Sequence, residues 1–122
     1  MKNVVIIDSV RTGLAKSHRG GFNITRADDM VAHLIDAIME RNPKVDPALV
    51  EDLILGCGNP EGAQGHNIAR NAAVLSKLPI ETGGTTINRY CSSGLNSIAM
   101  ACNQVASGHS AVSYTHLRAH ET

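Results

Sequence analysis

Short apolar runs alternate along the chain with longer stretches of helical periodicity, and this alternation constrains the fold more than any other feature. The runs lie in "NVVIIDSV" (residues 3–10), "DLILGCGNP" (52–60) and "GGTTINRY" (83–90). The apolar residues of the first two are largely consecutive, and the third contains the β-branched residues Thr85, Thr86 and Ile87. Such runs are typical of strands buried on both faces of a parallel sheet. The order strand, helix, strand, helix therefore predicts an α/β fold with a mostly parallel sheet.

The segments between these runs predict four helices. A Gly-rich loop over residues 12–24 leads into a helix from Thr25 to Arg41, with Thr25 and Asp28 expected to form a capping box. A short helix follows Asp46 and Pro47, and two longer ones cover residues 67–78 and 92–107. Apolar stripes mark the three long helices: Val31, Leu34, Ile35 and Ile38; Ile68, Ala72 and Leu75; Leu95, Ile98, Ala99, Cys102 and Val105. "HSAV" (109–112) begins a further strand, so the sheet is expected to be incomplete.

Composition excludes several classes of partner. Eleven basic and eleven acidic side chains leave no net charge, so we expect neither nucleic acid nor membrane as a partner. The apolar runs are too short to span a bilayer. Asp8 and Arg11 interrupt the opening run, which does not resemble a secretory signal. Three cysteines without framework spacing indicate a reducing, cytoplasmic setting.

The last segment, "VSYTHLRAHET" (112–122), differs from the rest of the chain. It shows neither helical nor strand periodicity and holds two of the six histidines. It resembles one reading frame of a sequencing-library adapter, so we interpret residues 112–122 as a non-native tail and residues 1–111 as the natural part. The alternative is a genuine polar tail.

Cys91 is the candidate for chemistry. In "TTINRYCSSGLNSIAMA" it stands where the third strand is expected to end and the last helix to begin. A helix N-terminus offers unpaired backbone N–H groups and the positive end of the dipole, which favour a nucleophilic thiolate and a developing oxyanion. The small residues that follow would admit a bulky substrate. From position alone, a cysteine packed as a small hydrophobic residue is the commoner role for a lone Cys.

Three ordered motifs across residues 1–111 resemble the thiolase family. "INRYCSSGLNS" (87–97) resembles its active-site signature, with Cys91 at the acyl-accepting cysteine. "VVIIDSVRTGLAKSHRGGF" resembles the family's N-terminus, and "DLILGCGNPEGAQGHNIARNAA" resembles the passage from its second strand to the next helix. The resemblance implies a partial N-terminal domain of a thiolase-like layered fold. "CSSGL" favours a degradative 3-ketoacyl-CoA thiolase, an acetyl-CoA acyltransferase of fatty-acid β-oxidation.

The resemblance also implies a mechanism and a set of partners. Cys91 would accept an acyl group from a 3-ketoacyl-CoA and pass it to a second CoA. CoA is then a substrate, no metal or redox cofactor is required, and the whole protein is expected to be a homodimer or homotetramer. The family's activating histidine and second cysteine occur in motifs that this chain does not contain, so the chain by itself is expected to be inactive.

The remaining chemistry-bearing residues have ordinary structural interpretations. The four histidines before residue 112 are expected at the surface, Cys57 and Cys102 inside the fold, and three arginines in solvent or in ion pairs: Arg11, Arg70 and Arg89. Three alternatives stay open. They are a biosynthetic acetoacetyl-CoA thiolase, a ketoacyl-synthase-type condensing enzyme, and an inert or dimer-forming fragment of the same fold.

Overall fold

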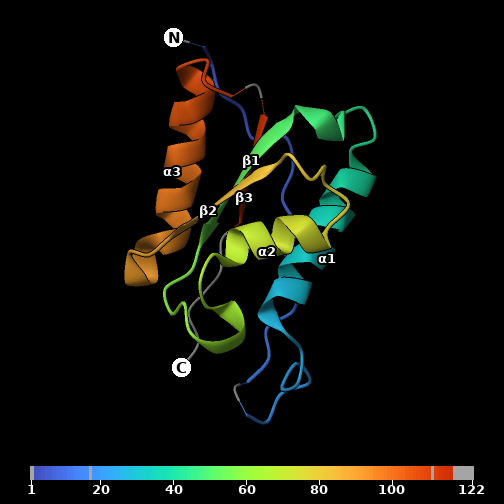
Figure 1. Cartoon of the computed structure of the whole chain (residues 1–122), viewed down its shortest axis with the longest axis vertical. Helices are drawn as coiled ribbons and strands as arrows, with labels where there is room; N and C mark the ends of the chain where they lie inside the picture. Colours follow the sequence, from blue (N-terminus) through green and yellow to red (C-terminus); the bar gives the residue numbers. More distant parts are fainter. Residues whose placement is uncertain (1, 17, 111, 117–122) are drawn as a thin grey trace.

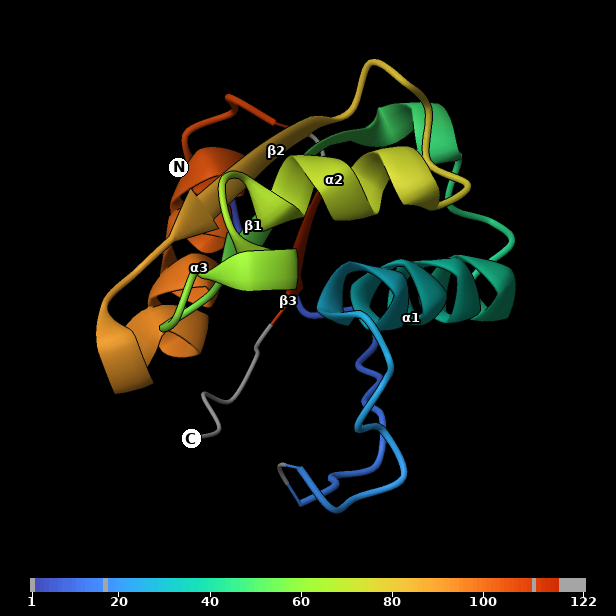
Figure 2. The same ribbon diagram turned by 60° about the horizontal axis from the view of Figure 1, so that its bottom comes forward.

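The computed structural model describes residues 2–16, 18–110 and 112–116 as one layered α/β unit (Figure 1). Three parallel strands form the sheet in the order β2-β1-β3: β1 (Val50–Gly56), β2 (Gly83–Ile87) and β3 (Val112–His116). Helices α1 (Ala27–Arg41) and α2 (Ile68–Leu75) lie on one side of it, and α3 (Ser93–Ala106) lies on the other (Figure 2). The predicted α/β class and parallel sheet are confirmed.

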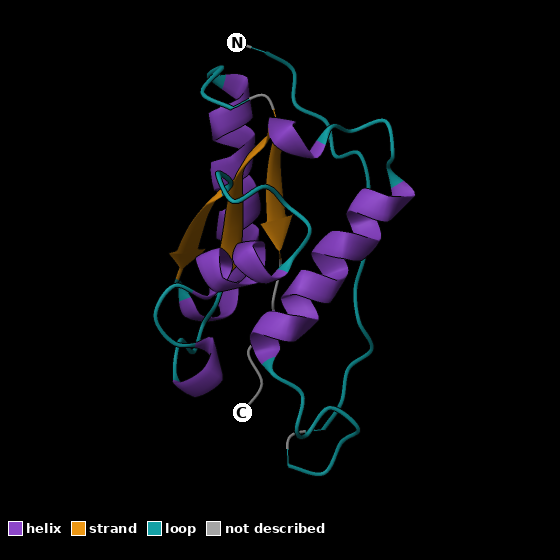
Figure 3. Cartoon of the chain, turned by 45° about the vertical axis from the view of Figure 1, so that its right-hand side comes forward, coloured by secondary structure: helices purple, strands orange, loops and turns teal. Residues whose placement is uncertain are grey.

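The central strand β1 explains the continuous apolar run. Leu53, Ile54 and Leu55 are all fully buried, although consecutive side chains of a strand point to opposite faces. Helices must therefore cover both faces, as Figure 3 shows for the three strands between α3 and the other helices. The strand begins at Val50, two residues earlier than predicted, because the preceding helix shrinks to a single 3₁₀ turn over Pro47–Leu49. Asp46 caps that turn as predicted, accepting a hydrogen bond from the N–H of Ala48.

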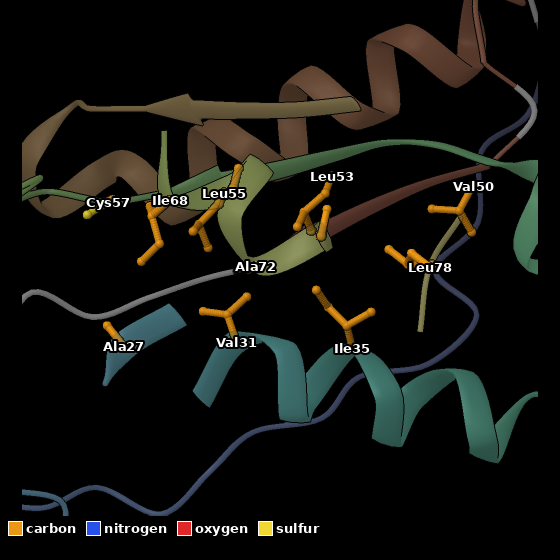
Figure 4. Packing of buried hydrophobic residues seen from close by; sticks show 12 residues of the cluster. Ala27, Val31, Ile35, Val50, Leu53, Leu55, Cys57, Ile68, Ala72 and Leu78 are labelled. Atoms are coloured by element: carbon orange, nitrogen blue, oxygen red, sulfur yellow. The ribbon is translucent and has the colours of Figure 1, made fainter. Parts of the chain in front are cut away.

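The main core lies between β1, α1 and α2. Val31 and Ile35 of α1 point from below toward Leu53 and Leu55 of β1, with Ile68 of α2 beside them (Figure 4). The predicted stripe of α1 is therefore confirmed, with Ile38 only half-buried. In α2 the stripe ends early: Ile68 and Ala72 are buried, whereas Leu75, in the last turn, is half-exposed.

The expected capping box of α1 does not form. The helix begins after Arg26, whose side chain makes no cap, and the side chain of Asp28 turns back to this arginine instead. Two hydrogen bonds join them, from Arg26 Nε to Asp28 Oδ1 at 3.1 Å and from Nη2 to Oδ2 at 2.9 Å. The bidentate arginine competes successfully for the carboxylate because its two donors match both oxygens.

The apolar stripe predicted for α3 is wrong as a buried face. The residues that α3 buries are small: Ser93, Gly94, Ser97 and Ala101. Leu95 is 70% exposed, and Ile98 and Val105 are only partly covered. Close packing of the helix against the sheet selects small side chains, so the larger ones point away from it. Among the described residues no element covers this outer face.

Residues 3–10 were predicted as a strand and are not one. They form an extended segment in which Val5, Ile6 and Ile7 are each more than 60% exposed. The segment is held at two points: Lys2 N–H donates to the carbonyl of Ala106, and Arg41 pairs with Asp8 at 3.0 Å. An apolar run becomes a strand only where it can hydrogen-bond to the edge of a sheet. Residues 3–10 do not pair with any strand of the described sheet.

Residues 112–116 belong to the segment that shows no strand periodicity in the sequence, yet they are a strand in the structure. They form β3, which pairs in parallel with β1. A strand was predicted to begin within residues 109–112, and it begins at Val112, the last residue of that range. Residues 117–122 lie outside the described part of the chain, and the adapter origin of the segment stays a prediction. None of the described helices combines the length and apolarity needed to cross a bilayer.

Gly84→Ala is expected to destabilise the intact protein because α2 crosses β2 backbone against backbone. A Cβ at Gly84 would lie 2.4 Å from the N atom of Arg70, and a main-chain atom cannot move aside as a side chain can. Overpacking of this kind costs about 1–3 kcal/mol. Gly83→Ala is the matched control, since its Cβ would meet first a carboxylate oxygen of Asp52 at 3.3 Å. Urea unfolding measures the stability of the two variants. Equal unfolding midpoints for Gly84→Ala and Gly83→Ala would contradict the close packing of α2 on β2.

Asp28→Asn is expected to lower stability at neutral pH and to have less effect in acid. Hydrogen bonds from Arg26 hold the pKa of Asp28 below the ordinary 3.8. The carboxylate therefore contributes stability that is complete above the unfolded-state pKa and is lost as the pH falls through the lower folded-state pKa. Thermal unfolding from pH 7 to pH 2 measures the difference between variant and wild type. A difference that stays constant over that range would show that ionisation of Asp28 does not matter.

Candidate functional site

Cys91 lies on an exposed turn between β2 and α3. The strand ends at Ile87 rather than at the predicted Tyr90, and a 3₁₀ turn over Tyr90–Ser92 leads directly into α3. This turn is the orange-yellow coil at the base of α3 in Figure 1. The predicted position of Cys91 at the start of the last helix is confirmed, and the residue is exposed to solvent.

The residue before the cysteine has an unusual backbone conformation. Tyr90 has φ = 50°, in the left-handed region that non-glycine residues seldom adopt. Two side chains hold it there. Asn88 Oδ1 accepts a hydrogen bond from the N–H of Tyr90 at 2.8 Å, and the Ser93 hydroxyl donates to the carbonyl of Tyr90 at 2.7 Å. The turn is therefore defined by specific bonds at both ends of Tyr90.

The expectation of free amides next to Cys91 is wrong for its two C-terminal neighbours. The N–H of Ser92 donates to the carbonyl of Arg89 at 3.0 Å, and the N–H of Ser93 donates to the carbonyl of Tyr90. The 3₁₀ turn satisfies these groups before the α-helix begins. They are therefore not available to an oxyanion unless the turn opens.

The first turn of α3 rests directly on the sheet. A Cβ at Gly56, the last residue of β1, would lie 2.4 Å from the carbonyl carbon of Ser93 and 2.6 Å from the N atom of Gly94. Only glycine allows this approach. The cysteine-bearing turn is therefore fixed relative to the central strand.

The other two cysteines are more enclosed than Cys91. Cys57 follows β1, is 1% exposed and donates its N–H to the carbonyl of Ile87 at 2.9 Å. Cys102, on α3, is half-buried, and all three thiols are free. Cys57 is thus confirmed as a residue of the core, whereas Cys102 lies on the incompletely covered side of α3.

The four histidines and two of the three arginines match their ordinary interpretations, whereas Arg70 is neither exposed nor ion-paired with any described residue. All four histidines before residue 112 are exposed: His18, His33, His66 and His109. Arg11 and Arg89 are exposed as well, and Arg70 donates from Nη1 to the carbonyl of Thr82 at 2.6 Å. Arg70 thereby ties α2 to the loop before β2 and has a structural role.

Sequence reasoning missed the residues that shape the turn. Asn88 could have been found, because an Asn side chain that accepts a hydrogen bond from the backbone N–H two residues later is a common turn signal. Ser93 carries no such signal, since its role depends on bonds to residues three and four positions earlier. Gly56 depends on a helix 37 residues further along the chain, which no local pattern reveals.

Comparison with known proteins agrees with this arrangement. The family described as "Thiolase, N-terminal domain" matches residues 4–114. A 3-ketoacyl-CoA thiolase from Vibrio vulnificus (strain YJ016) is 45% identical over 108 residues, which are 88% of this chain and 28% of that protein. A 3-ketoacyl-CoA thiolase from Aliivibrio salmonicida is also 45% identical, and one from Erwinia tasmaniensis is 42% identical, with the same coverage.

The chain thus spans little more than a quarter of the length of these curated relatives. The matched region includes β1, the helices α1 and α2, the turn that carries Cys91 and all of α3. A match over most of the chain, combined with the parallel sheet and the cysteine at the start of α3, leads to one conclusion. The chain belongs to the thiolase family, and its residues 4–114 correspond to the N-terminal domain.

Proposed function

We propose that the protein carrying this chain is a 3-ketoacyl-CoA thiolase with Cys91 as the acyl-accepting nucleophile. The observation that carries the proposal is the exposed thiol on a rigid turn at the start of α3. Relatives named 3-ketoacyl-CoA thiolase, which are 42–45% identical over 88% of the chain, support the substrate class.

In the proposed reaction the Cys91 thiolate attacks the keto carbon of a 3-ketoacyl-CoA. The bond between that carbon and its neighbour on the CoA side breaks, and the departing carbanion takes up a proton to become acetyl-CoA. The shortened acyl group remains as a thioester on the sulfur of Cys91. The thiol of a second CoA then attacks this thioester, loses its proton and restores the free cysteine, which is ping-pong chemistry.

Three features of the site support this role. Exposure lets a bulky CoA thioester reach the sulfur. The helix N-terminus places the positive end of the α3 dipole near the developing charge. The contact at Gly56 and the bonds to Tyr90 keep the thiol in one place, which reduces the entropic cost of reaching the transition state.

The proposal extends to the setting of the enzyme. We place it in the cytoplasm, in fatty-acid β-oxidation, as a homodimer or homotetramer, with CoA as a substrate and without a metal or redox cofactor. The activating histidine and the second cysteine would come from the part of the protein outside this chain.

Cys91→Ser in the intact protein is expected to abolish thiolysis and acyl-enzyme formation. A hydroxyl is a much weaker nucleophile than a thiolate at neutral pH, so the first step would not proceed at a measurable rate. Mass spectrometry after mixing with acetoacetyl-CoA would detect the acylated protein. Cys102→Ser is the control and keeps acylation. Near-normal turnover by Cys91→Ser would refute the assignment.

Iodoacetamide is expected to alkylate Cys91 of the folded protein before Cys102, and Cys57 last. The order follows the exposure of the three residues, which falls from exposed to half-buried to 1%. Peptide mapping after limited labelling measures it. Labelling of the three thiols at equal rates would contradict the enclosed positions of Cys57 and Cys102.

Residues 1–122 expressed alone are expected to show no thiolysis and poor solubility. Loss of a general base typically lowers a rate about 10²- to 10⁴-fold. The outer face of α3, with Leu95 at its start, and the exposed residues 5–7 present apolar surface that promotes aggregation. Light scattering measures the aggregation of the chain, and an acetoacetyl-CoA cleavage assay measures its thiolysis. A monodisperse chain that cleaves acetoacetyl-CoA, with activity lost in Cys91→Ala, would overturn the expectation.

A further inference from the structure

We propose that Ser93 is a positioning residue for Cys91, because its buried hydroxyl joins the two sides of the turn that presents the thiol. The proposal rests on the assigned role of Cys91 as nucleophile. It concerns how that nucleophile is held and aimed.

The hydroxyl of Ser93 makes two hydrogen bonds across the turn. Its Oγ accepts from the N–H of Arg89 at 2.8 Å and donates to the carbonyl of Tyr90 at 2.7 Å. Cys91 lies within the loop that these bonds close. A hydroxyl is a small side-chain group that donates and accepts at once, so alanine at this position would leave both backbone groups without their side-chain partner.

The bonds act on the residue that sets the direction of Cys91. Tyr90 has φ = 50°, a conformation that an L residue with a Cβ adopts at a cost. Its N–H is held by Asn88 Oδ1 at 2.8 Å, and its carbonyl by Ser93. Because Tyr90 directly precedes Cys91, relaxation of its backbone would swing the cysteine side chain away from its present direction.

Ser93 is also the point at which the turn contacts the sheet. It is 1% exposed, and its carbonyl carbon lies where a Cβ of Gly56 would be only 2.4 Å away. The backbone of Ser93 therefore cannot move toward β1. The two hydrogen bonds of the Ser93 hydroxyl hold the backbone of Arg89 and Tyr90 against this fixed residue, and they thereby fix the direction of the Cys91 thiol.

Ser97 provides a matched control for this role. It is also fully buried on α3, and its hydroxyl donates to the carbonyl of Gly94 at 2.6 Å. Both serines thus bond to a main-chain carbonyl three residues earlier. The bond from Ser97 to Gly94 lies beyond Cys91 in the chain, whereas the bonds of Ser93 to Arg89 and Tyr90 span it. Ser97→Ala therefore removes a comparable buried hydroxyl one turn further along the helix.

The test compares Ser93→Ala with Ser97→Ala in the intact protein. Ser93→Ala is expected to slow single-turnover acylation of Cys91 by acetoacetyl-CoA roughly 10- to 100-fold, the effect of misplacing a reacting group, with KM nearly unchanged. Amide hydrogen exchange at Arg89 is expected to accelerate in the same variant. Ser97→Ala is expected to acylate at the wild-type rate, whatever its effect on thermal stability.

Asn88 supplies a second pair of variants should Ser93→Ala fail to fold. The residue is exposed, so replacement does not disturb the core. Asn88→Ala removes the acceptor for the Tyr90 N–H and is expected to slow acylation, whereas Asn88→Asp keeps that acceptor and is expected to restore most of the rate. Rescue by aspartate is not expected if Asn88 acts only through bulk stability.

Two outcomes would overturn the proposal. One is wild-type acylation in both Ser93→Ala and Asn88→Ala, and the other is an equal loss in Ser93→Ala and Ser97→Ala. Failure of the proposed function gives a different result, namely a wild-type protein that forms no acyl-enzyme. In that case the iodoacetamide rate at Cys91, expected to fall in Ser93→Ala relative to Ser97→Ala, still reports whether the hydroxyl holds the turn.

Discussion

The contact between the end of β1 and the first turn of α3 determines much of the surrounding structure. At Gly56 the strand offers no side chain, and the backbone of Ser93 and Gly94 occupies the space that a Cβ would need. Because the two backbones are this close, the face of α3 toward the sheet must consist of small residues. The same contact places the start of α3, and with it Cys91, at a fixed distance from the central strand.

This packing has a consequence for the larger side chains of α3. Leu95 does not face the sheet and is 70% exposed, and Ile98 is only half-buried. On the other side of the sheet, Val31, Ile35 and Ile68 pack with Leu53 and Leu55 in an ordinary apolar core. The two faces of β1 are thus buried by different means, one by small residues at close range and the other by branched side chains.

The cysteine turn combines this rigid support with local strain. Tyr90 is kept in a left-handed conformation by Asn88 on its N–H and Ser93 on its carbonyl. Strained backbone persists only where surrounding bonds over-determine it, and it is common where a side chain must be presented to a substrate. The arrangement gives an exposed thiol a defined direction, which a cysteine on a flexible loop would lack.

The amino-acid sequence by itself determined the class of the fold, the central strand, the cap at Asp46 and the position of Cys91 at the start of a helix. These follow from local properties: apolar runs, helical spacing and turn residues within a few positions of one another. The family resemblance was also readable in the sequence, because its motifs are contiguous.

Tertiary structure decided the features that depend on distant partners. The run at residues 3–10 has the composition of a strand but pairs with no described sheet edge, whereas residues 112–116 lack the periodicity and yet pair with β1. Which face of α3 packs against the sheet follows from its close backbone contact with Gly56 and not from the spacing of its apolar residues. Strand pairing and close packing are set by backbone groups and available space, which composition does not encode locally, so only the assembled fold could settle them.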